Sequence, residues 1–384
     1  SMAWGQAIND KYALDGRDPS SGVGVQWCHG LFDRPFHPPA PILGLVRQRD
    51  SRTHMSRLDM EAYRAFTDQP AAVTPHPIIV IGAGLAGAVA ARILADHGFD
   101  VVVLDKGRRV GGRASRRRVD DVVLTHGTGS LNQTPDWFSS WADVEVLKKR
   151  AVFSEDGYTV LDGPETIAAW LDGIDVLTST TVARLEREED AWLVHDLDGN
   201  RWQASGVIIT APLPQAHRML EDAPEAWVTH PYEATWTVVL VHQEPCPAEV
   251  LAGMRRAGLD VQADEDPRGI VVHLSPEWSQ TNLEMERIDV VQAFLTMMEG
   301  PYEKVPEWIT SATKQAHRWR FGKSSAIGER SNLPRLVEAG DAWHEPVGTG
   351  GAALCSGAWA AANIAWQCSP RPQTTTTAVQ QTLF

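Results

Sequence analysis

The sequence contains few cysteines and no long apolar run, and both absences narrow the class of protein. Four cysteines stand among 384 residues, at Cys28, Cys246, Cys355 and Cys368, without the spacing of a disulfide framework or a metal site. We therefore expect no metal and a reducing, cytoplasmic setting, since no secretory signal is recognisable. Because no apolar run approaches the roughly 20 residues that a membrane-spanning helix needs, we expect no membrane insertion.

Positive charge is also scarce. The formal net charge is −14, from 35 Lys and Arg against 49 Asp and Glu. This balance excludes a protein whose whole surface binds nucleic acid, because phosphate contacts need a basic face. The local exception is the segment 108–118, which holds six arginines. Fifteen tryptophans suit either ordinary packing or an aromatic-walled site for a flat ligand.

A glycine-rich loop between a strand and a helix is the most informative motif. Gly82, Gly84 and Gly87 form G-x-G-x-x-G, in which the three glycines permit a tight turn, a close approach to a pyrophosphate and close helix–strand packing. The N–H groups of the helix that follows meet phosphate charge, and Asp105 is placed to accept hydrogen bonds from a ribose. The expected order is a strand over 78–81, this loop, a helix over 86–97 and a strand over 101–104. We predict a dinucleotide-binding βαβ unit.

Two further segments favour FAD over NAD as the dinucleotide. Lys106 begins a segment in which Gly111 and Gly112 allow a second backbone approach and Arg113 can neutralise a pyrophosphate. Far downstream, a strand ends in Gly340-Asp341, and 348–351 then opens a helix. The positive end of a helix dipole suits the electron-rich edge of a reduced flavin. An NAD dehydrogenase has no use for this distant strand and helix.

These residues resemble the flavin-containing amine oxidase superfamily, most closely its renalase-like branch, over roughly residues 77–368. The matching segments are IGAGLAG at 81–87, the lysine–glycine–arginine pattern at 106–118, APLPQAHRML at 211–220, HRWRF at 317–321 and EAGDAW at 338–343. The resemblance implies that Pro212 lies near the cofactor and that Arg117 is the member of the arginine run that touches phosphate. It also implies hydride transfer from substrate to flavin.

The chain departs from the branch at one place. Where the branch reads Asp-His-Gly-Ala-Gln-Tyr-Phe, this chain reads Thr-His-Gly-Thr-Gly-Ser-Leu over 125–131. The missing Gln and aromatic stand beside the isoalloxazine in the family, so the resemblance does not give the substrate. His126 is predicted to contact the flavin or to be structural. Lys323 either serves a flavin–water–lysine arrangement or is a solvated surface residue, and Cys355 is expected to be a small buried residue.

The site predictions are as follows. The predicted catalytic residues, as walls of the substrate side of the flavin, are Trp319, His126 and Trp236, with Trp343 as a further wall. The predicted FAD contacts are Gly82, Ala83, Gly84, Leu85, Ala86, Gly87, Asp105, Lys106, Gly111, Gly112, Arg113, Arg117, His126, Gly127, Pro212, Gly340, Asp341, Gly350, Gly351 and Ala352. His317 is predicted to orient its strand.

The predicted fold class is α/β: a Rossmann-like FAD-binding domain with an inserted, mainly antiparallel α+β substrate domain and an irregular N-terminal segment. The expected boundaries are 1–67 for that segment, 68–77 for a linker, 78–140 and 321–368 for the FAD-binding domain, 141–320 for the substrate domain together with some FAD-domain strands, and 369–384 for a disordered tail.

The N-terminal segment resembles the C-terminal end of class II DNA photolyases. The matches are Asn9 to Pro19, Gly24 to Trp27, Asp33 to Pro35 and Pro41 to Arg47. About sixty residues cannot hold a second FAD and flip out a DNA lesion. We favour an origin in a longer photolyase–oxidoreductase fusion, with a photolyase region upstream, over a surviving packing arm.

The last five residues, 380–384, resemble the peptide that binds the bacterial sliding clamp through a Gln followed by Leu-Phe anchors. A random polar tail is the alternative interpretation.

Two functions therefore follow from the sequence. One is an FAD-dependent oxidoreductase that acts on an amine or a reduced nicotinamide-like small molecule, with reoxidation by oxygen. The other is an FAD-binding accessory module of a DNA-repair photolyase fusion that turns over no free metabolite.

Overall fold

The computed structural model describes residues 74–128, 130–132, 151–154, 157–160, 163–263 and 266–368. All of them belong to one compact unit, Thr67–Phe384. The photolyase-like segment, most of the predicted linker and the clamp-like tail lie outside the described residues, so those predictions stay predictions.

A parallel five-stranded sheet forms the centre of the described unit. Its strand order is β17-β12-β1-β2-β8, and each neighbouring pair is parallel. The strands are β1 Ile78–Ile81, β2 Val101–Leu104, β8 Asp175–Leu177, β12 Gly206–Ile209 and β17 Leu336–Glu338. Short apolar runs suit these strands because a parallel sheet is covered on both faces.

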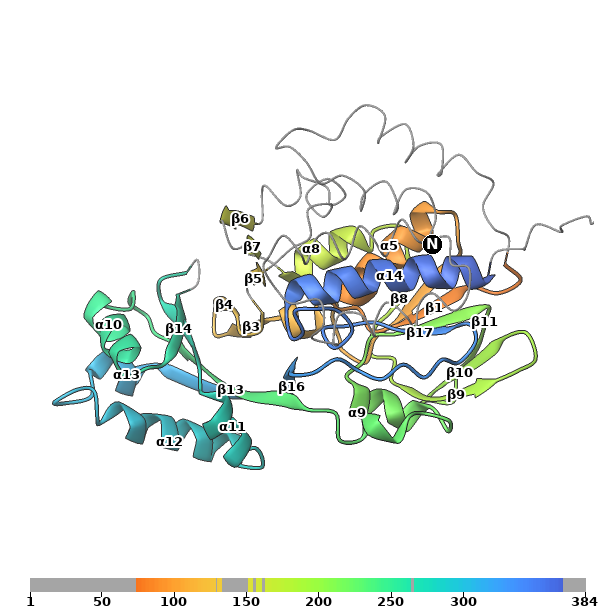
Figure 1. The fold of residues 1–384 in the computed structure, drawn as a ribbon. Coiled ribbons are helices and arrows are strands. Elements are labelled where there is room, and N and C mark those ends of the chain that lie inside the picture. Colours follow the sequence, from red (N-terminus) through yellow and green to blue (C-terminus); the bar gives the residue numbers. More distant parts are fainter. Residues whose placement is uncertain are drawn as a thin grey trace, which may run out of the picture. The chain divides into compact units, whose positions relative to one another are not determined.

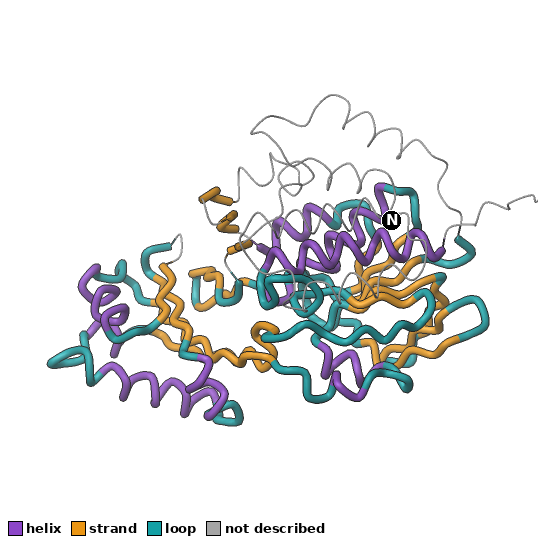
Figure 2. The backbone as a smooth tube through the Cα atoms, in the orientation of Figure 1, coloured by secondary structure: helices purple, strands orange, loops and turns teal. Residues whose placement is uncertain are grey.

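Three helices cover one face of this sheet (Figures 1 and 2). They are α5 Leu85–Asp96, α8 Gly163–Trp170 and α14 Gly350–Cys368. Small residues let α5 and α14 lie close together: a Cβ on Gly357 would stand 2.4 Å from the carbonyl oxygen of Ala86. Helix α5 ends within one residue of the predicted end, and Gly98 follows with a φ of +78°, a backbone conformation that favours glycine after a helix.

A small antiparallel sheet and a helical segment cover the opposite face. The sheet consists of β9 Val182–Arg187, β10 Trp192–Asp196 and β11 Arg201–Ala204, and the segment contains α9 Leu213–Ala216, η2 His217–Met219 and η3 Glu225–Trp227. Alternate residues of the strands face the two sides, so Ile78 and Val80 contact the helices whereas Ile79 and Ile81 join the second core. This is a Rossmann-like arrangement of three layers, as the sequence predicts.

A second, antiparallel sheet has the order β14-β15-β13-β16. Its strands are β13 Tyr232–Val241, β14 Asp260–Ala263, β15 Gly269–His273 and β16 Thr313–Ser324. On one face the core contains Trp236 and Phe294 and involves the helices α10 Ala248–Arg256, α11 Pro276–Thr281, α12 Arg287–Met298 and α13 Glu307–Ser311. The hairpin β3 Arg116–Val119 and β4 Val122–Thr125 packs against the other face, where Leu124 meets Gly269.

The remaining described elements are η1 Gly112–Ala114, β5 Ser130–Asn132, β6 Ala151–Ser154 and β7 Gly157–Val160. The second sheet draws only on residues 232–324. Elements from 163 to 209 lie with the parallel sheet and its covering layers. The inserted part is therefore shorter than the stretch 141–320, and the strands that the prediction reserved for the FAD-binding domain are β8 and β12.

Candidate functional site

The candidate site lies where the carboxyl ends of several parallel strands converge. Gly82 follows β1, Asp105 follows β2, Thr210 follows β12 and Gly340 closely follows β17. In open α/β sheets ligands bind at this edge, where the connections leave toward opposite sides. A small pocket opens there, lined by Arg113, Thr210, Ala211, Pro212, Tyr232, Ala339, Gly340, Asp341, Ala342 and Trp343.

The glycine loop has the close contacts that its motif requires. Gly82 has a φ of +110°, and a Cβ there would stand 2.2 Å from Oγ1 of Thr210. A Cβ on Gly87 would stand 1.9 Å from the carbonyl oxygen of Gly82, so helix and strand could not pack as they do. Gly84 differs, because the nearest atom to its Cβ position is Cα of Gly112 at 3.9 Å. Its missing side chain leaves room at the helix start, where a phosphate would bind.

Asp105 ties the two cofactor-facing loops together. Its carboxylate accepts hydrogen bonds from the backbone N–H groups of Ala83 and Gly107, each at 2.6 Å. The N–H group of Gly111 donates to the carbonyl oxygen of Ala83 at 2.9 Å. A carboxylate has about four acceptor positions, so Asp105 keeps the capacity to accept from ribose hydroxyls. These contacts fit the dinucleotide that the motif predicts.

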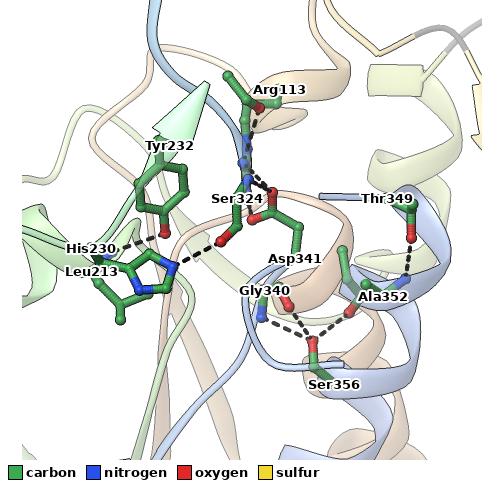
Figure 3. A network of polar contacts seen from close by, with 12 residues as sticks. Arg113, Leu213, His230, Tyr232, Ser324, Gly340, Asp341, Thr349, Ala352 and Ser356 are labelled. Carbon is green, nitrogen blue, oxygen red and sulfur yellow. Dashed lines mark hydrogen bonds and ion pairs between the residues drawn. The ribbon is translucent and has the colours of Figure 1, made fainter. Parts of the chain in front are cut away.

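Arg113 and Asp341 form the centre of a polar network (Figure 3). The guanidinium of Arg113 binds both carboxylate oxygens of Asp341, at 2.7 and 2.9 Å, and also donates to the carbonyl oxygen of Gly322. Although burial lowers the pKa of Arg113, the charge of Asp341 raises it above its ordinary value. The predicted partner of Arg113 was a pyrophosphate; the structure pairs it with the aspartate of the Gly-Asp strand end.

Three residues of this network were missed by the sequence analysis. The N–H group of Ser324 donates to Asp341 at 2.8 Å, and His230 Nε2 lies 2.8 Å from the Ser324 hydroxyl. The hydroxyl of Tyr232 accepts from Leu213 N–H, and burial together with the charge of Asp341 raises the pKa of Tyr232 to about 12. The sequence carries no motif for these residues, because β13 and β16 bring them to the site only in the folded chain.

The start of α14 is anchored to the Gly-Asp segment. The Ser356 hydroxyl donates to the carbonyl oxygen of Gly340, and the Gly340 N–H group binds the same hydroxyl oxygen. Gly348 N–H donates to the carbonyl oxygen of Asp341, and Thr349 Oγ1 accepts from Ala352 N–H at 3.0 Å. The helix start predicted at 350–352 is therefore held beside Asp341, with its positive dipole end toward this edge.

A second group of polar residues lies on the face of the antiparallel sheet that the β3–β4 hairpin covers. The ring centroids of His126, His317 and Trp319 lie 4.4 to 5.1 Å apart, and Trp319 Nε1 donates to the carbonyl oxygen of His126. Arg117 Nε donates to Gln315 at 2.8 Å, and its NH1 lies 3.4 Å from His317 Nδ1. We call His126, His317, Trp319 and Arg117 the histidine–arginine cluster.

The segment 126–128 joins this cluster to the cofactor edge. Thr128 N–H donates to the carbonyl oxygen of Arg113 at 2.7 Å, and a Cβ on Gly127 would stand 2.0 Å from the same oxygen. Gly127 also faces the ring of Trp319. The predicted catalytic residues Trp319 and His126 thus lie together, and the segment that contains His126 contacts the backbone of Arg113 through Thr128.

Two predicted residues lie elsewhere. Trp236 is buried in the core on the opposite face of the antiparallel sheet, where its Nε1 donates to the carbonyl oxygen of Asn282. The strand period of two explains this, because Thr237, and not Trp236, pairs with His317. Arg117, predicted to touch phosphate, contacts Gln315 and His317 in the cluster instead.

The other predicted positions are plainly placed. Lys106 donates to Gln215, Pro212 and Trp343 line the pocket, and Lys323 is an exposed partner of Glu233. Leu85 and Ala86 begin α5. The structure contains no helix long and apolar enough to cross a membrane, and no group of three potential metal-binding side chains, within the described residues.

Comparisons with known proteins agree with a Rossmann-like, FAD-binding fold. Residues 80–144 match the family described as an NAD(P)-binding Rossmann-like domain. A protein of Mycobacterium tuberculosis provisionally named flavin-containing monoamine oxidase is 39% identical over 157 residues, which are 40% of this chain and 31% of that protein. Digeranylgeranylglycerophospholipid reductase 1 of Methanothermobacter thermautotrophicus is 26% identical over 208 residues, 50% of this chain and 48% of that one. The chain therefore spans about a third to a half of these relatives.

Solved structures extend the likeness of fold. A protein of Exiguobacterium sp. 255-15, provisionally named protoporphyrinogen oxidase, has a TM-score of 0.62 at 13% identity, over 77% of this chain and 99% of that one. Putrescine oxidase has a TM-score of 0.55 at 13% identity, over 75% and 98%. The chain thus has a Rossmann-like FAD-binding fold with an inserted antiparallel sheet, and its dinucleotide site fits FAD.

A separate match concerns the photolyase resemblance. A deoxyribodipyrimidine photo-lyase of Methanothermobacter thermautotrophicus is 38% identical over 56 residues, which are 15% of this chain and 12% of that protein. So short a match supports a local relation only.

Proposed function

We propose that this chain is an FAD-dependent oxidoreductase that takes a hydride from a small molecule, either an amine or a reduced nicotinamide-like compound. The observation that carries the proposal is the convergence of the glycine loop, Asp105, the Gly340-Asp341 strand end and the start of α14 at one edge of the parallel sheet. FAD, when bound, supplies the acceptor for the hydride, and oxygen then takes the two electrons.

The chain's own residues bind, orient and exclude water. The glycine loop and the first turn of α5 would hold the pyrophosphate, and Asp105 the ribose. The dipole of α14 stabilises negative charge at its N-terminus, which lowers the cost of reducing the cofactor there. Asp341 neutralises the charge of Arg113. The ion pair therefore contributes a fixed polar surface to the site and no unpaired positive charge.

Anaerobic reduction tests this function directly. The purified protein is loaded with FAD and mixed without oxygen with amines and reduced nicotinamides, while the visible absorption band of oxidised flavin is followed. We expect one compound class to bleach the band and oxygen to restore it with formation of hydrogen peroxide. If FAD is retained but no compound in a broad panel bleaches it, the oxidoreductase proposal is wrong.

The photolyase match favours a second candidate, an FAD-binding accessory module of a photolyase fusion. In that role the chain would bind a photolyase or a sliding clamp and turn over no free metabolite. Pull-down of a bacterial sliding clamp by the full chain, compared with a chain lacking 380–384, distinguishes the two. Capture that depends on those residues, together with an unreactive flavin, would favour the accessory role.

A further inference from the structure

The histidine–arginine cluster has an unusual charge for a site that accepts an amine. Arg117 and the neighbouring Arg287 both contribute positive charge to the cluster. Burial first, and then the charge of Arg287, lower the pKa of Arg117. Burial first, and then the charges of both arginines, lower the pKa of His317. The charge of His273 also contributes to lowering the pKa of His126, after the larger effect of burial. Burial lowers the pKa of His273, and the charge of the acidic Asp260 opposes this effect. Within the described residues no carboxylate is paired with Arg117. A cationic substrate would be repelled here.

The hydrogen bonds show which donors remain for a ligand. Arg117 cannot accept, so His317 Nδ1 accepts from it and the proton of the neutral ring sits on Nε2. Burial, then the charges of Arg117 and Arg287, lower the pKa of His317 to about 4, so the ring is neutral near pH 7. The planar guanidinium has five N–H donors, of which Gln315 and His317 take two, so three remain for an anionic oxygen group. One side of the cluster therefore offers donors only.

His126 adds a buried ring nitrogen that has no hydrogen-bond partner among the described residues. The residue is 4% exposed, and its Nδ1 makes no hydrogen bond within the described part of the chain. Burial, the largest cause, and the charges of His317 and Arg117 lower the pKa of His126 to about 3, against a hydrogen bond to the Ser115 backbone, so near pH 7 the neutral ring has one N–H and one lone pair. A buried polar atom without a partner costs free energy, so a ligand group that hydrogen-bonds Nδ1 would be stabilised here.

We propose that the substrate of this enzyme carries an anionic oxygen group, a carboxylate or a phosphate, which Arg117 and His317 bind, and a neighbouring polar group that forms a hydrogen bond with Nδ1 of His126. This proposal rests on the proposed function and narrows it: an amine substrate would be an amino acid-like compound and not a simple polyamine, and a nicotinamide substrate would bind through its phosphate. Trp319 supplies the apolar wall next to these groups.

A set of ligands of matched shape tests the charge preference. Calorimetric titrations of the FAD-loaded protein would use benzoate, benzamide and benzamidinium, which carry charges of about −1, 0 and +1 on similar frames, and phenyl phosphate as the other anion. We expect an anion to bind at least about tenfold more tightly than benzamide, with benzamidinium weakest. Benzoate above phenyl phosphate would identify a carboxylate, and the reverse a phosphate.

Two variants assign the preference to the cluster. Arg117→Met should remove the tenfold advantage of the anion. Arg118→Met, on the same strand but exposed, should keep it. The preference for benzamidinium, the failure of both anions to bind, or an unchanged advantage in Arg117→Met would each overturn the proposal.

These outcomes are separable from failure of the proposed function. If the protein does not retain FAD, or retained FAD is never reduced, the oxidoreductase role fails. The same titrations on the FAD-free protein would still report whether the cluster binds anions.

Discussion

Two neighbouring histidines, the buried His126 and the half-buried His317, stay uncharged near pH 7 because burial and nearby positive charges disfavour their protonated forms. Burial is the largest cause in both, followed for His126 by the charges of His317 and Arg117; the pKa values fall to about 3 and about 4. A cluster with this electrostatics would bind anions, as proposed above, through neutral N–H donors and one guanidinium, so its charge is constant over the physiological range. At the residue scale, the neutrality of the two histidines leaves the guanidinium of Arg117 as the charged group of the cluster.

The depressed pKa of His126 has a consequence for acid stability. A group whose pKa is lowered on folding binds fewer protons in the folded state, so the free energy of unfolding falls as pH drops from about 6.5 to about 3. Replacing His126 by Gln removes that group. We expect the slope of unfolding free energy against pH between 4 and 6 to decrease by up to about 1.4 kcal/mol per pH unit.

Urea denaturation at a series of pH values measures this slope. An unchanged slope in His126→Gln would mean that the histidine is not held neutral in the folded protein.

Arg330 is the residue that holds the segment before β17 in place. Its guanidinium lies between the rings of Trp343 and Trp359, 4.3 and 4.2 Å from their centroids, and pairs with the buried Glu338. Arg330→Met leaves the carboxylate of Glu338 buried without its charge partner, so we expect a loss of about 3 kcal/mol or more in unfolding free energy.

The control for this variant is Arg335→Met, since Arg335 pairs with the exposed Asp190 and such surface pairs contribute about 1 kcal/mol or less. In a Glu338→Gln background the Arg330→Met loss should shrink. Equal losses in both backgrounds would show that the ring contacts, not the ion pair, dominate.

At the scale of elements, the glycine loop separates folding from cofactor binding. Gly87→Ala places a Cβ against the carbonyl oxygen of Gly82, which forces β1 and α5 apart. Gly84→Val meets no atom closer than 3.9 Å at its Cβ, so the element survives while the phosphate position is blocked. The two substitutions should therefore have different results even though both lie in one motif.

We expect Gly84→Val to unfold within a few degrees of the FAD-free parent and to purify without flavin, and Gly87→Ala to be strongly destabilised. Thermal unfolding by circular dichroism and the flavin content after purification provide the two measurements. Gly300→Ala, at an exposed position in a turn, serves as the control for replacing glycine. A yellow Gly84→Val protein would contradict the assignment of the phosphate position.

At the scale of the whole described unit, β16 links the two sheets through the site. Arg113 donates to Gly322 near the end of β16, and Ser324 donates to Asp341 beside the parallel sheet. Trp319, farther back on the same strand, reaches the segment that follows the β3–β4 hairpin. A ligand bound at this edge therefore stabilises contacts of both sheets.

FAD should raise the unfolding temperature of the unit as one cooperative transition. A ligand that binds only the folded state adds about 2.7 kcal/mol at a hundred times its dissociation constant. Differential scanning calorimetry with increasing FAD measures the shift, and Gly84→Val should show none. A second transition that FAD leaves unmoved would mean that the antiparallel sheet unfolds independently.

The sequence alone was enough to predict the Rossmann-like layer, because its signals are local. A short apolar run, three glycines at fixed spacing and a terminal Asp105 dictate β1, α5 and β2 through backbone sterics and burial. The later Gly340-Asp341 strand end and the glycine-opened helix are equally local, so the FAD-binding fold and α14 followed from them. The sequence predicted that some strands within 141–320 belong to the FAD-binding domain but did not single them out, since β8 and β12 are short strands without a motif.

Only the tertiary structure decided which side chains meet. Ser324 contacts Asp341, and Tyr232 and His230 come beside Ser324 because β13 pairs with β16, which no local pattern encodes. The register of β13 against β16 places Trp236 in the core and places His317 and Trp319 beside His126. The sequence of a strand does not reveal which of its two faces is covered, so this outcome could not be predicted. The same packing places Arg117 beside the neutral histidines of the cluster, whereas the sequence analysis predicted that it touches a phosphate. The sequence by itself thus determined the cofactor-binding framework, whereas the charge of the neighbouring site is a property of the folded chain.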